Sequence, residues 1–165
     1  VWSSDPATGA IVAQEIPVHK TVRTTSTVWQ VIWDTGIQEK LRAIRKVHLP
    51  NETGGVVLGY IDQKLKAIYV VDVLPAPPDS DADPTGFTRG VDGLEASLQE
   101  VVRRTANIVG YIGEWHSHPP SVSAKPSQTD RCLIKKLSEI LAQDGLPALM
   151  LIVGEAEFSL SVREI

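Results

Sequence analysis

Two histidines and one aspartate in the second half of the chain have the residue types and the spacing of metal ligands. His116 and His118 are two positions apart, and residues two apart on a β-strand point to the same face. Asp130 follows in the first turn of an expected helix, from which its carboxylate can reach the histidines. Three protein ligands with one open position, held by an acidified water, form the usual catalytic zinc site. The spacing predicts one catalytic Zn²⁺ ion bound by these residues.

Each part of this pattern also has an ordinary structural explanation. His-x-His pairs often occur among packed or surface histidines, and Ser127 and Asp130 are favoured residues at the start of a helix. A closed structural zinc site is disfavoured, because it needs four strong ligands and Cys132 is the single cysteine. A zinc deaminase would need a Pro-Cys-x-x-Cys pair, which is absent from the sequence. The two segments together favour the catalytic site.

A second segment of interest runs from Asn51 to Gly59 and contains Glu52 followed by two glycines. Taken alone, Glu52 is interpreted as an exposed carboxylate, and the glycines as a tight turn or a close backbone approach. A hydrolytic metal site, however, needs a carboxylate that takes a proton from water and returns it to the leaving amine. Glu52 is the candidate for that role.

The two segments together resemble the JAMM or MPN-plus metalloproteases, which contain the JAB domain and include deubiquitinases and bacterial relatives. The shared motifs, within about residues 30–165, are Glu-Thr-Gly-Gly-x-x-Leu-Gly, His-Ser-His-Pro and Pro-Ser-x-x-Asp. The resemblance implies that His116, His118 and Asp130 bind zinc. It also implies that Glu52 is the general acid and base and that the Ser127 hydroxyl stabilises the oxyanion. One departure is that eight residues separate His118 from Ser127, where seven are usual, and we expect the extra residue to bulge outward.

The motifs look like those of the bacterial branch, whose genes often lie beside, or are fused to, a ThiF-like ubiquitin-activating homologue in antiphage operons. The resemblance implies a zinc-dependent isopeptidase or peptidase that cleaves after the C-terminal glycine of a ubiquitin-like or similarly conjugated protein. It would act in deconjugation or in precursor processing. Two alternatives stay open: a catalytically inactive MPN scaffold or binding module, and a hydrolase that releases cysteine from a sulfur-carrier protein.

Four further residues are weighed as parts of this site. Glu114 has the same strand parity as His116 and is interpreted either as a contact of substrate or ligand histidine or as a partner in a salt bridge. Phe87 and Arg89 follow a Pro- and Asp-rich loop that could cover an extended substrate tail, although an ordinary solvated loop explains them equally well. Cys132 is expected to be a buried packing residue rather than a nucleophile.

Composition excludes several other classes of protein. The 165 residues include 16 Lys and Arg against 20 Asp and Glu, a balance that disfavours nucleic acid as the main partner. No apolar run approaches the roughly 18 residues that cross a membrane, and the lone cysteine favours the cytosol. The chain begins at Val1 without a methionine, and we expect it to be a piece of a longer protein.

The elements expected around these residues indicate an α+β fold with one mixed, curved sheet flanked by helices, an architecture that the resemblance makes JAB-like and cytidine-deaminase-like. Residues 1–25 are interpreted as an arm or linker and residues 26–165 as the domain. On the last helix we expect Leu133, Leu137 and either Ile140 or Leu141 to form the apolar stripe. The expected strands cover residues 27–33, 55–61, 67–74, 108–115, 148–153 and 158–162, and the expected helices cover residues 37–47, 94–104 and 127–142.

Overall fold

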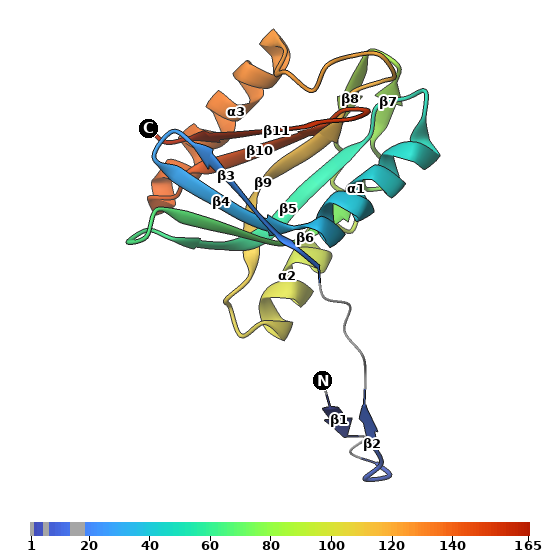
Figure 1. Cartoon of the computed structure of the whole chain (residues 1–165), viewed down its shortest axis with the longest axis vertical. Helices are drawn as coiled ribbons and strands as arrows, with labels where there is room; N and C mark the ends of the chain where they lie inside the picture. The colour runs from blue at the N-terminus through green and yellow to red at the C-terminus, as the bar shows by residue number, and fades with distance from the viewer. Residues whose placement is uncertain (1, 5–6, 14–18) are drawn as a thin grey trace.

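A mixed, seven-stranded sheet forms the centre of the computed structural model, which describes residues 2–4, 7–13 and 19–165 (Figure 1). Its strand order is β11-β10-β9-β5-β6-β4-β3. The strands are β3 (Thr21–Ser26), β4 (Trp29–Asp34), β5 (Gly54–Asp62), β6 (Ala67–Pro75), β9 (Gly110–Ser117), β10 (Ala148–Val153) and β11 (Phe158–Arg163). The pairs β9–β10 and β4–β6 are parallel, while the other neighbours are antiparallel. This confirms the predicted mixed sheet.

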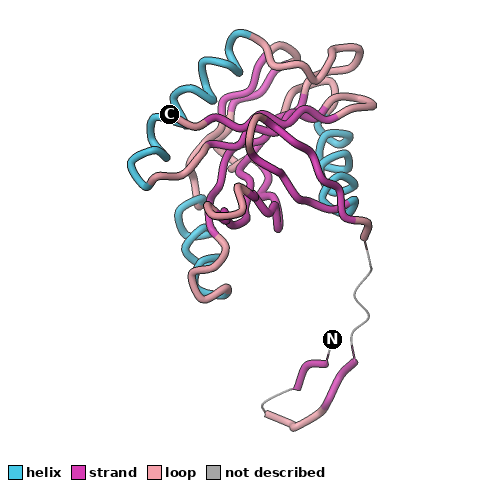
Figure 2. The backbone as a smooth tube through the Cα atoms, turned by 60° about the vertical axis from the view of Figure 1, so that its left-hand side comes forward, coloured by secondary structure: helices cyan, strands magenta, loops and turns pink. Residues whose placement is uncertain are grey.

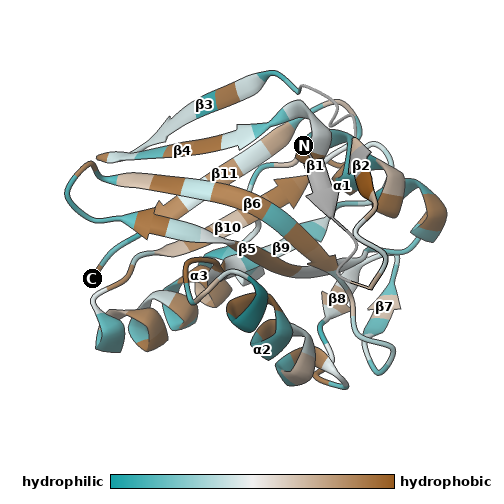
Figure 3. Ribbon diagram, turned by 90° about the horizontal axis from the view of Figure 1, so that it is seen from below, coloured by the Kyte–Doolittle hydropathy of each residue, from teal (hydrophilic) through white to brown (hydrophobic). Residues whose placement is uncertain are grey.

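Helices cover both faces of the sheet. Helix α1 (Thr35–His48) lies on one face, and α2 (Leu94–Arg104) and α3 (Gln128–Leu141) lie on the other (Figure 3). Strand β10 shows the reason, because its alternate residues belong to different cores. Leu149 and Leu151 pack in the same cluster as Leu41 of α1, whereas Met150 packs in the same cluster as Ile134 of α3.

Local signals explain where the helices begin. The Asp34 carboxylate accepts a hydrogen bond from the Ile37 amide and caps α1. Ser127 caps α3 in the same way, and α2 follows Gly93, whose φ of 69° is in the left-handed region. The stripe expected on α3 is confirmed at Leu137 and Leu141, whereas Leu133 is 39% exposed and Ile134 is buried in its place.

The sheet curves until its two edge strands approach each other. The Ser26 hydroxyl at the end of β3 accepts a hydrogen bond from the Val162 amide of β11. Lys66 and Glu164 form an ion pair between the β5–β6 turn and the C-terminal end. Figure 2 shows the strands in the middle of the domain and the helices at its periphery.

Two segments differ from the sequence-based expectation. Strand β3 begins at Thr21, so the sheet includes residues that were assigned to the arm. The remainder of that arm falls partly outside the described residues, and within it β1 (Trp2–Ser4) pairs with β2 (Ile11–Ala13). The loop expected after β6 contains a hairpin of β7 (Asp81–Asp83) and β8 (Gly86–Thr88). Among the described residues, no helix is both long and apolar enough to cross a bilayer.

Candidate metal centre

The end of β9 holds both candidate histidines at the centre of the sheet. His116 is paired with Gly54 of β5 on one side and with Ile152 of β10 on the other. His118 lies just beyond the strand, where its amide donates to the Val153 carbonyl over 3.0 Å. The two residues are 7% and 6% exposed. Two neighbouring strands therefore fix the direction of the backbone that carries both imidazoles.

Asp130 is positioned by the first turn of α3. The Ser127 hydroxyl accepts from the Asp130 amide over 3.2 Å, and the Asp130 carboxylate accepts from the Ser127 amide over 2.6 Å. This capping box satisfies two helix N–H groups and also fixes the carboxylate. The structural explanation of Ser127 and Asp130 as helix-start residues is thus compatible with a metal-binding role.

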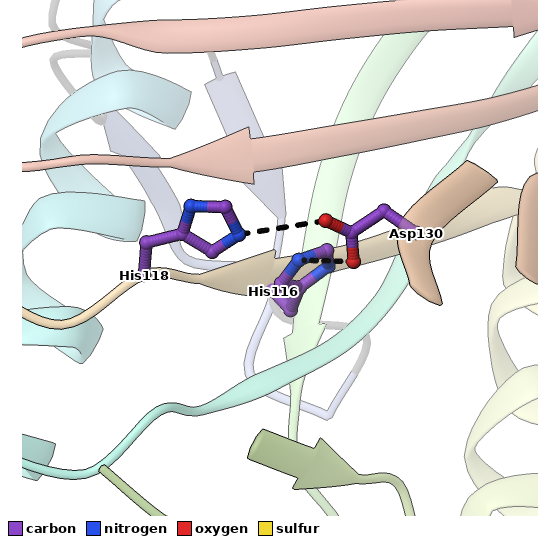
Figure 4. A group of neighbouring side chains, drawn as sticks. All are labelled: His116, His118 and Asp130. Carbon is purple, nitrogen blue, oxygen red and sulfur yellow. Dashed lines mark ion pairs between the residues drawn. The ribbon is translucent and has the colours of Figure 1, made fainter. Parts of the chain in front are cut away.

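The three side chains converge on one point (Figure 4). Asp130 Oδ1 is 3.1 Å from Nε2 of His116, and its Oδ2 is 3.6 Å from Nε2 of His118. One possible ligand atom from each residue lies within 4.8 Å of the others. The structure thus brings together the three residues that the sequence singled out.

Two hydrogen-bonding observations test whether this group suits a metal ion. Nδ1 of His118 lies 2.6 Å from the Ser123 carbonyl oxygen, and a carbonyl can only accept, so Nδ1 carries a hydrogen and the neutral form of this imidazole presents the lone pair of Nε2. Nε2 of His116 is buried and has no hydrogen-bond partner within the described part of the chain. Two imidazole nitrogens and a carboxylate oxygen form a donor set that zinc prefers. The residues therefore fit a zinc-type ion.

The charge of Asp130 is maintained despite its burial. Burial by itself would raise the pKa of Asp130, but its contacts with His116, His118 and Ser127 hold that pKa well below the ordinary range. A carboxylate that stays ionised at neutral pH is available as a ligand.

Glu52 lies at the same cavity, between α1 and β5. Its amide donates to the Asp83 carbonyl over 3.0 Å, and its side chain is half-buried. Burial raises the pKa of Glu52, and its electrostatic interactions with His116 and His118 only partly oppose this effect. A carboxyl whose pKa is raised toward neutrality suits a group that both takes and returns a proton.

A cavity of about 730 Å³ opens onto these residues. Glu52, Ser127 and the three candidate ligands contribute to its wall, and so do Phe87, Arg89 and Glu114. Residues 76–90, here called the flap, include the β7–β8 hairpin and line one part of the cavity. The Phe87 ring packs directly against Gly54, where a Cβ atom would lie 2.3 Å from its Cε1. Gly54 is thus a close-approach glycine, one of the readings that its sequence context left open.

Arg89 and Glu114 pair with each other. Nε and Nη2 of Arg89 donate to the two carboxylate oxygens of Glu114 over 2.9 and 3.0 Å. The Tyr111 hydroxyl donates to the same carboxylate over 2.9 Å, and burial together with that charge raises the pKa of Tyr111. The salt-bridge reading of Glu114 is confirmed. The pair joins the flap to the strand that carries His116.

Cys132 departs from its prediction. It is exposed and contributes to the cavity wall, since the buried face of α3 runs through Ile134, Ser138 and Leu141 instead. Sequence reasoning also missed the residues that hold His118 from outside its own strand, namely Ser123 and Arg45. A signal for Arg45 existed in the sequence, because this charged residue follows Ile37 and Leu41 at the same four-residue spacing on α1.

The family follows from a comparison with known protein families. The family model for prokaryotic homologs of the JAB domain matches residues 34–164, which include every residue of the candidate centre. The chain belongs to the prokaryotic JAB family. The resemblance noted from the motifs is thereby confirmed.

Individual relatives of this JAB chain carry enzyme names. A CD-NTase/cGAS isopeptidase of Enterobacter hormaechei is 35% identical over 107 residues, which cover 63% of this chain and 56% of that protein. A probable metalloprotease of Sinorhizobium fredii is 27% identical over 64% of this chain and 65% of its own length. A CD-NTase/cGAS isopeptidase of Vibrio cholerae is 31% identical over 71% of this chain and 70% of its own. The aligned part thus spans less than two thirds of the first two relatives.

The fold is shared with a solved structure. The solution structure of a Desulfitobacterium hafniense protein superposes on 81% of this JAB chain and 88% of its own, with a TM-score of 0.56 and 22% identity. This similarity confirms the predicted α+β fold class.

Proposed function

We propose that this JAB domain is a zinc-dependent isopeptidase or peptidase that hydrolyses the bond after the C-terminal glycine of a ubiquitin-like or similarly conjugated protein. The observation that carries the proposal is the convergence of two imidazoles and a carboxylate on one cavity, with half-buried Glu52 at the same wall. The isopeptidase names of two relatives support an isopeptide bond as the target.

His116, His118 and Asp130 would hold the zinc ion through two imidazole nitrogens and a carboxylate oxygen. Zinc in such a site supplies Lewis acidity, which polarises a carbonyl group and lowers the pKa of water. The protein must supply the proton transfers and must orient the scissile amide.

Glu52 would carry the proton. Its carboxylate removes a proton from the attacking water as the water oxygen bonds to the carbonyl carbon. It then gives that proton to the amine nitrogen while the C–N bond breaks, so that the products are a free amine and a carboxylic acid, which ionises at neutral pH. The raised pKa of Glu52 supports this double role.

Ser127 would stabilise the negative charge that develops on the carbonyl oxygen. Its Oγ accepts a hydrogen bond from the Asp130 amide, which leaves the hydroxyl hydrogen free to donate. A donor aimed at the developing oxyanion lowers the barrier of acyl transfer.

An extended substrate tail would lie in the cavity between the flap and α3. Phe87 from the flap and Leu133 and Leu137 from α3 contribute apolar wall to it. We propose that Phe87 contacts the tail directly, and that Arg89 and Glu114 act on it by holding the flap in place. The proposal also includes a ThiF-like activating enzyme as a partner, either fused to this domain or encoded nearby. It further includes a cytosolic location and a role in bacterial antiviral defence. The CD-NTase/cGAS names of two relatives support the defence role.

The test combines metal analysis with cleavage of defined peptides. The peptides end in glycine, and the glycine is joined to a lysine ε-amine, to an ordinary peptide or to cysteine. We expect the purified domain to contain one zinc ion and to cleave the lysine-linked set. Asp130→Ala should lose the metal, whereas Glu52→Gln should keep it and lose at least about 100-fold in turnover. Glu139→Gln, on the exposed side of α3, is the matched control and should retain both properties.

Each alternative gives a different result. Zinc binding without cleavage of any peptide would favour the inactive MPN scaffold, and preference for the cysteine-linked set would favour the sulfur-carrier hydrolase. A domain that binds no metal, or Glu52→Gln turning over at the unmodified rate, would refute the proposed mechanism.

A further inference from the structure

Arg45 is a buried cation in a place where an apolar side chain would be expected. Ile37, Leu41 and Arg45 are the buried residues of α1, each four positions after the last. The first two pack in the main core, and Arg45 is 7% exposed. A buried charge is unfavourable unless other groups compensate for it.

The compensation that the structure offers to Arg45 is incomplete. Within the described residues no carboxylate pairs with Arg45, and its Nη2 is buried without a hydrogen-bond partner. Its place in the last turn of α1 gives some stabilisation from the helix dipole. An apolar residue at this position would continue the stripe and leave no donor unsatisfied. Core stability therefore does not explain the arginine.

The one hydrogen bond that the Arg45 side chain makes within the described residues leads to the candidate metal centre. Nε donates to the His118 carbonyl oxygen over 2.9 Å in a buried setting. The His118 amide is held by Val153 of β10 and its Nδ1 by Ser123, so Arg45 adds a third anchor from α1 on the opposite face of the sheet. His118 lies just past the end of β9, where the pairing with β5 has ended and the backbone is held by fewer contacts than within the strand.

Helix α1 also leads to Glu52. The helix ends at His48, the Asn51 amide donates back to the His48 carbonyl over 3.0 Å, and Glu52 comes next. Arg45 thus ties the segment that presents the proton-transferring carboxylate to the backbone of a metal ligand.

We propose that Arg45 is a positioning residue, which holds His118 in the geometry required for metal binding and in register with Glu52. This inference rests on the proposed function. It is distinguishable from a simple charge effect, because removing a nearby positive charge should by itself strengthen the binding of a cation. Loss of positioning should weaken that binding.

The experiment measures zinc affinity by competition with a chelator, using the whole domain at fixed pH and salt. Arg45→Met removes the guanidinium while keeping a long apolar stem, and Lys46→Met removes an exposed charge from the same turn as a matched control. We expect Arg45→Met to bind zinc about 10- to 100-fold more weakly, as is usual when a group that orients a ligand is lost. Lys46→Met should bind as the unmodified domain does. Arg45→Met should also lower kcat with little change in KM.

The outcomes separate this inference from the proposed function. If the unmodified domain binds no zinc, both fail. If it binds zinc, and Arg45→Met binds it equally well or more tightly, the positioning role alone is overturned. If Arg45→Met does not fold, the zinc affinity of Arg45→Lys is measured instead. Weaker zinc binding by Arg45→Lys than by Lys46→Met supports the inference, and equal zinc binding overturns it.

Discussion

The end of β9 and the flap form two parts of one cavity, yet they are held in different ways. Residues 112–118 of β9 and its extension are all buried, and the strand has neighbours on both sides. Most residues of the flap are exposed or half-exposed, and its two strands of three residues each pair with each other. A segment with few buried apolar contacts opens locally at a lower free energy than a central strand does. The two candidate histidine ligands thus lie on the rigid part, and the surface that we propose to contact substrate lies on the adjustable part.

Polar contacts attach the flap, in addition to the packing of the Phe87 ring on Gly54. The Arg89–Glu114 pair joins it to β9, and the Asn51 side chain and the Glu52 amide donate to the carbonyls of Ala82 and Asp83. Substitutions in the flap should therefore change substrate selection, whereas substitutions in β9 should change stability and metal binding together.

The largest expected effect comes from a methyl group added inside β9. A Cβ atom on Gly113 would lie 1.9 Å from the Leu149 carbonyl oxygen of β10, and backbone at that position cannot move aside cheaply. Gly113→Ala should lower the free energy of unfolding by about 3 kcal/mol and weaken zinc binding, because β9 and β10 must separate. Chemical denaturation and chelator competition measure the two effects.

Gly110 provides the matched control on the same strand. A Cβ atom there meets nothing within 4 Å, so Gly110→Ala should leave stability unchanged or slightly higher. Equal stability of the two alanine variants would show that the ligand-bearing strand is less rigid than its packing implies.

A smaller effect is expected at the start of α3, where structure and chemistry share one hydroxyl. Ser127→Ala removes the cap and should reduce the free energy of unfolding by about 1 kcal/mol. Ser127→Gly should reduce it by only about 0.3 kcal/mol. Both variants lack the donor that we assign to the oxyanion, so both should lose about 100-fold in kcat. Loss of activity in the alanine variant alone would mean that Ser127 acts through the helix start and not on the substrate.

The sequence was a good guide where the signals are local. The cap at Ser127 and the apolar periodicity of α1 and α2 identified the helices, because a helix is specified by neighbours along the chain. The three candidate ligands could be singled out because strand parity and helix-start chemistry are also local. Strand β3 was missed for the opposite reason: its mostly Thr and Ser sequence has no apolar alternation, and pairing with β4 defines it.

Contacts between distant segments could not be found in this way. The His118 carbonyl and the Ser123 carbonyl are backbone atoms that any residue type supplies, so no sequence pattern identifies their bonds with Arg45 and with the His118 ring. The exposure of Cys132 likewise depends on how α3 is rotated on the sheet. That rotation is set by the fit of Ile134 against β10, which no periodicity resolves to one position.

A small effect on stability, and the sharpest test of the comparison, is expected from the pair that joins the flap to β9. Arg89→Gln alone leaves the Glu114 carboxylate buried without its guanidinium. That variant therefore combines the loss of the flap contact with the cost of an unpaired buried charge. The double variant Arg89→Gln with Glu114→Gln leaves no unpaired charge, and its free energy of unfolding should change by less than about 1 kcal/mol, since replacing both partners of a buried pair is often neutral. The flap should then be held less firmly, so KM for glycine-ended peptides should rise severalfold while kcat and zinc affinity stay unchanged. Arg103→Gln with Glu100→Gln, an exposed pair on α2, serves as the control. A fall in zinc affinity in the flap variant would show instead that the flap and the end of β9 form one mechanical unit.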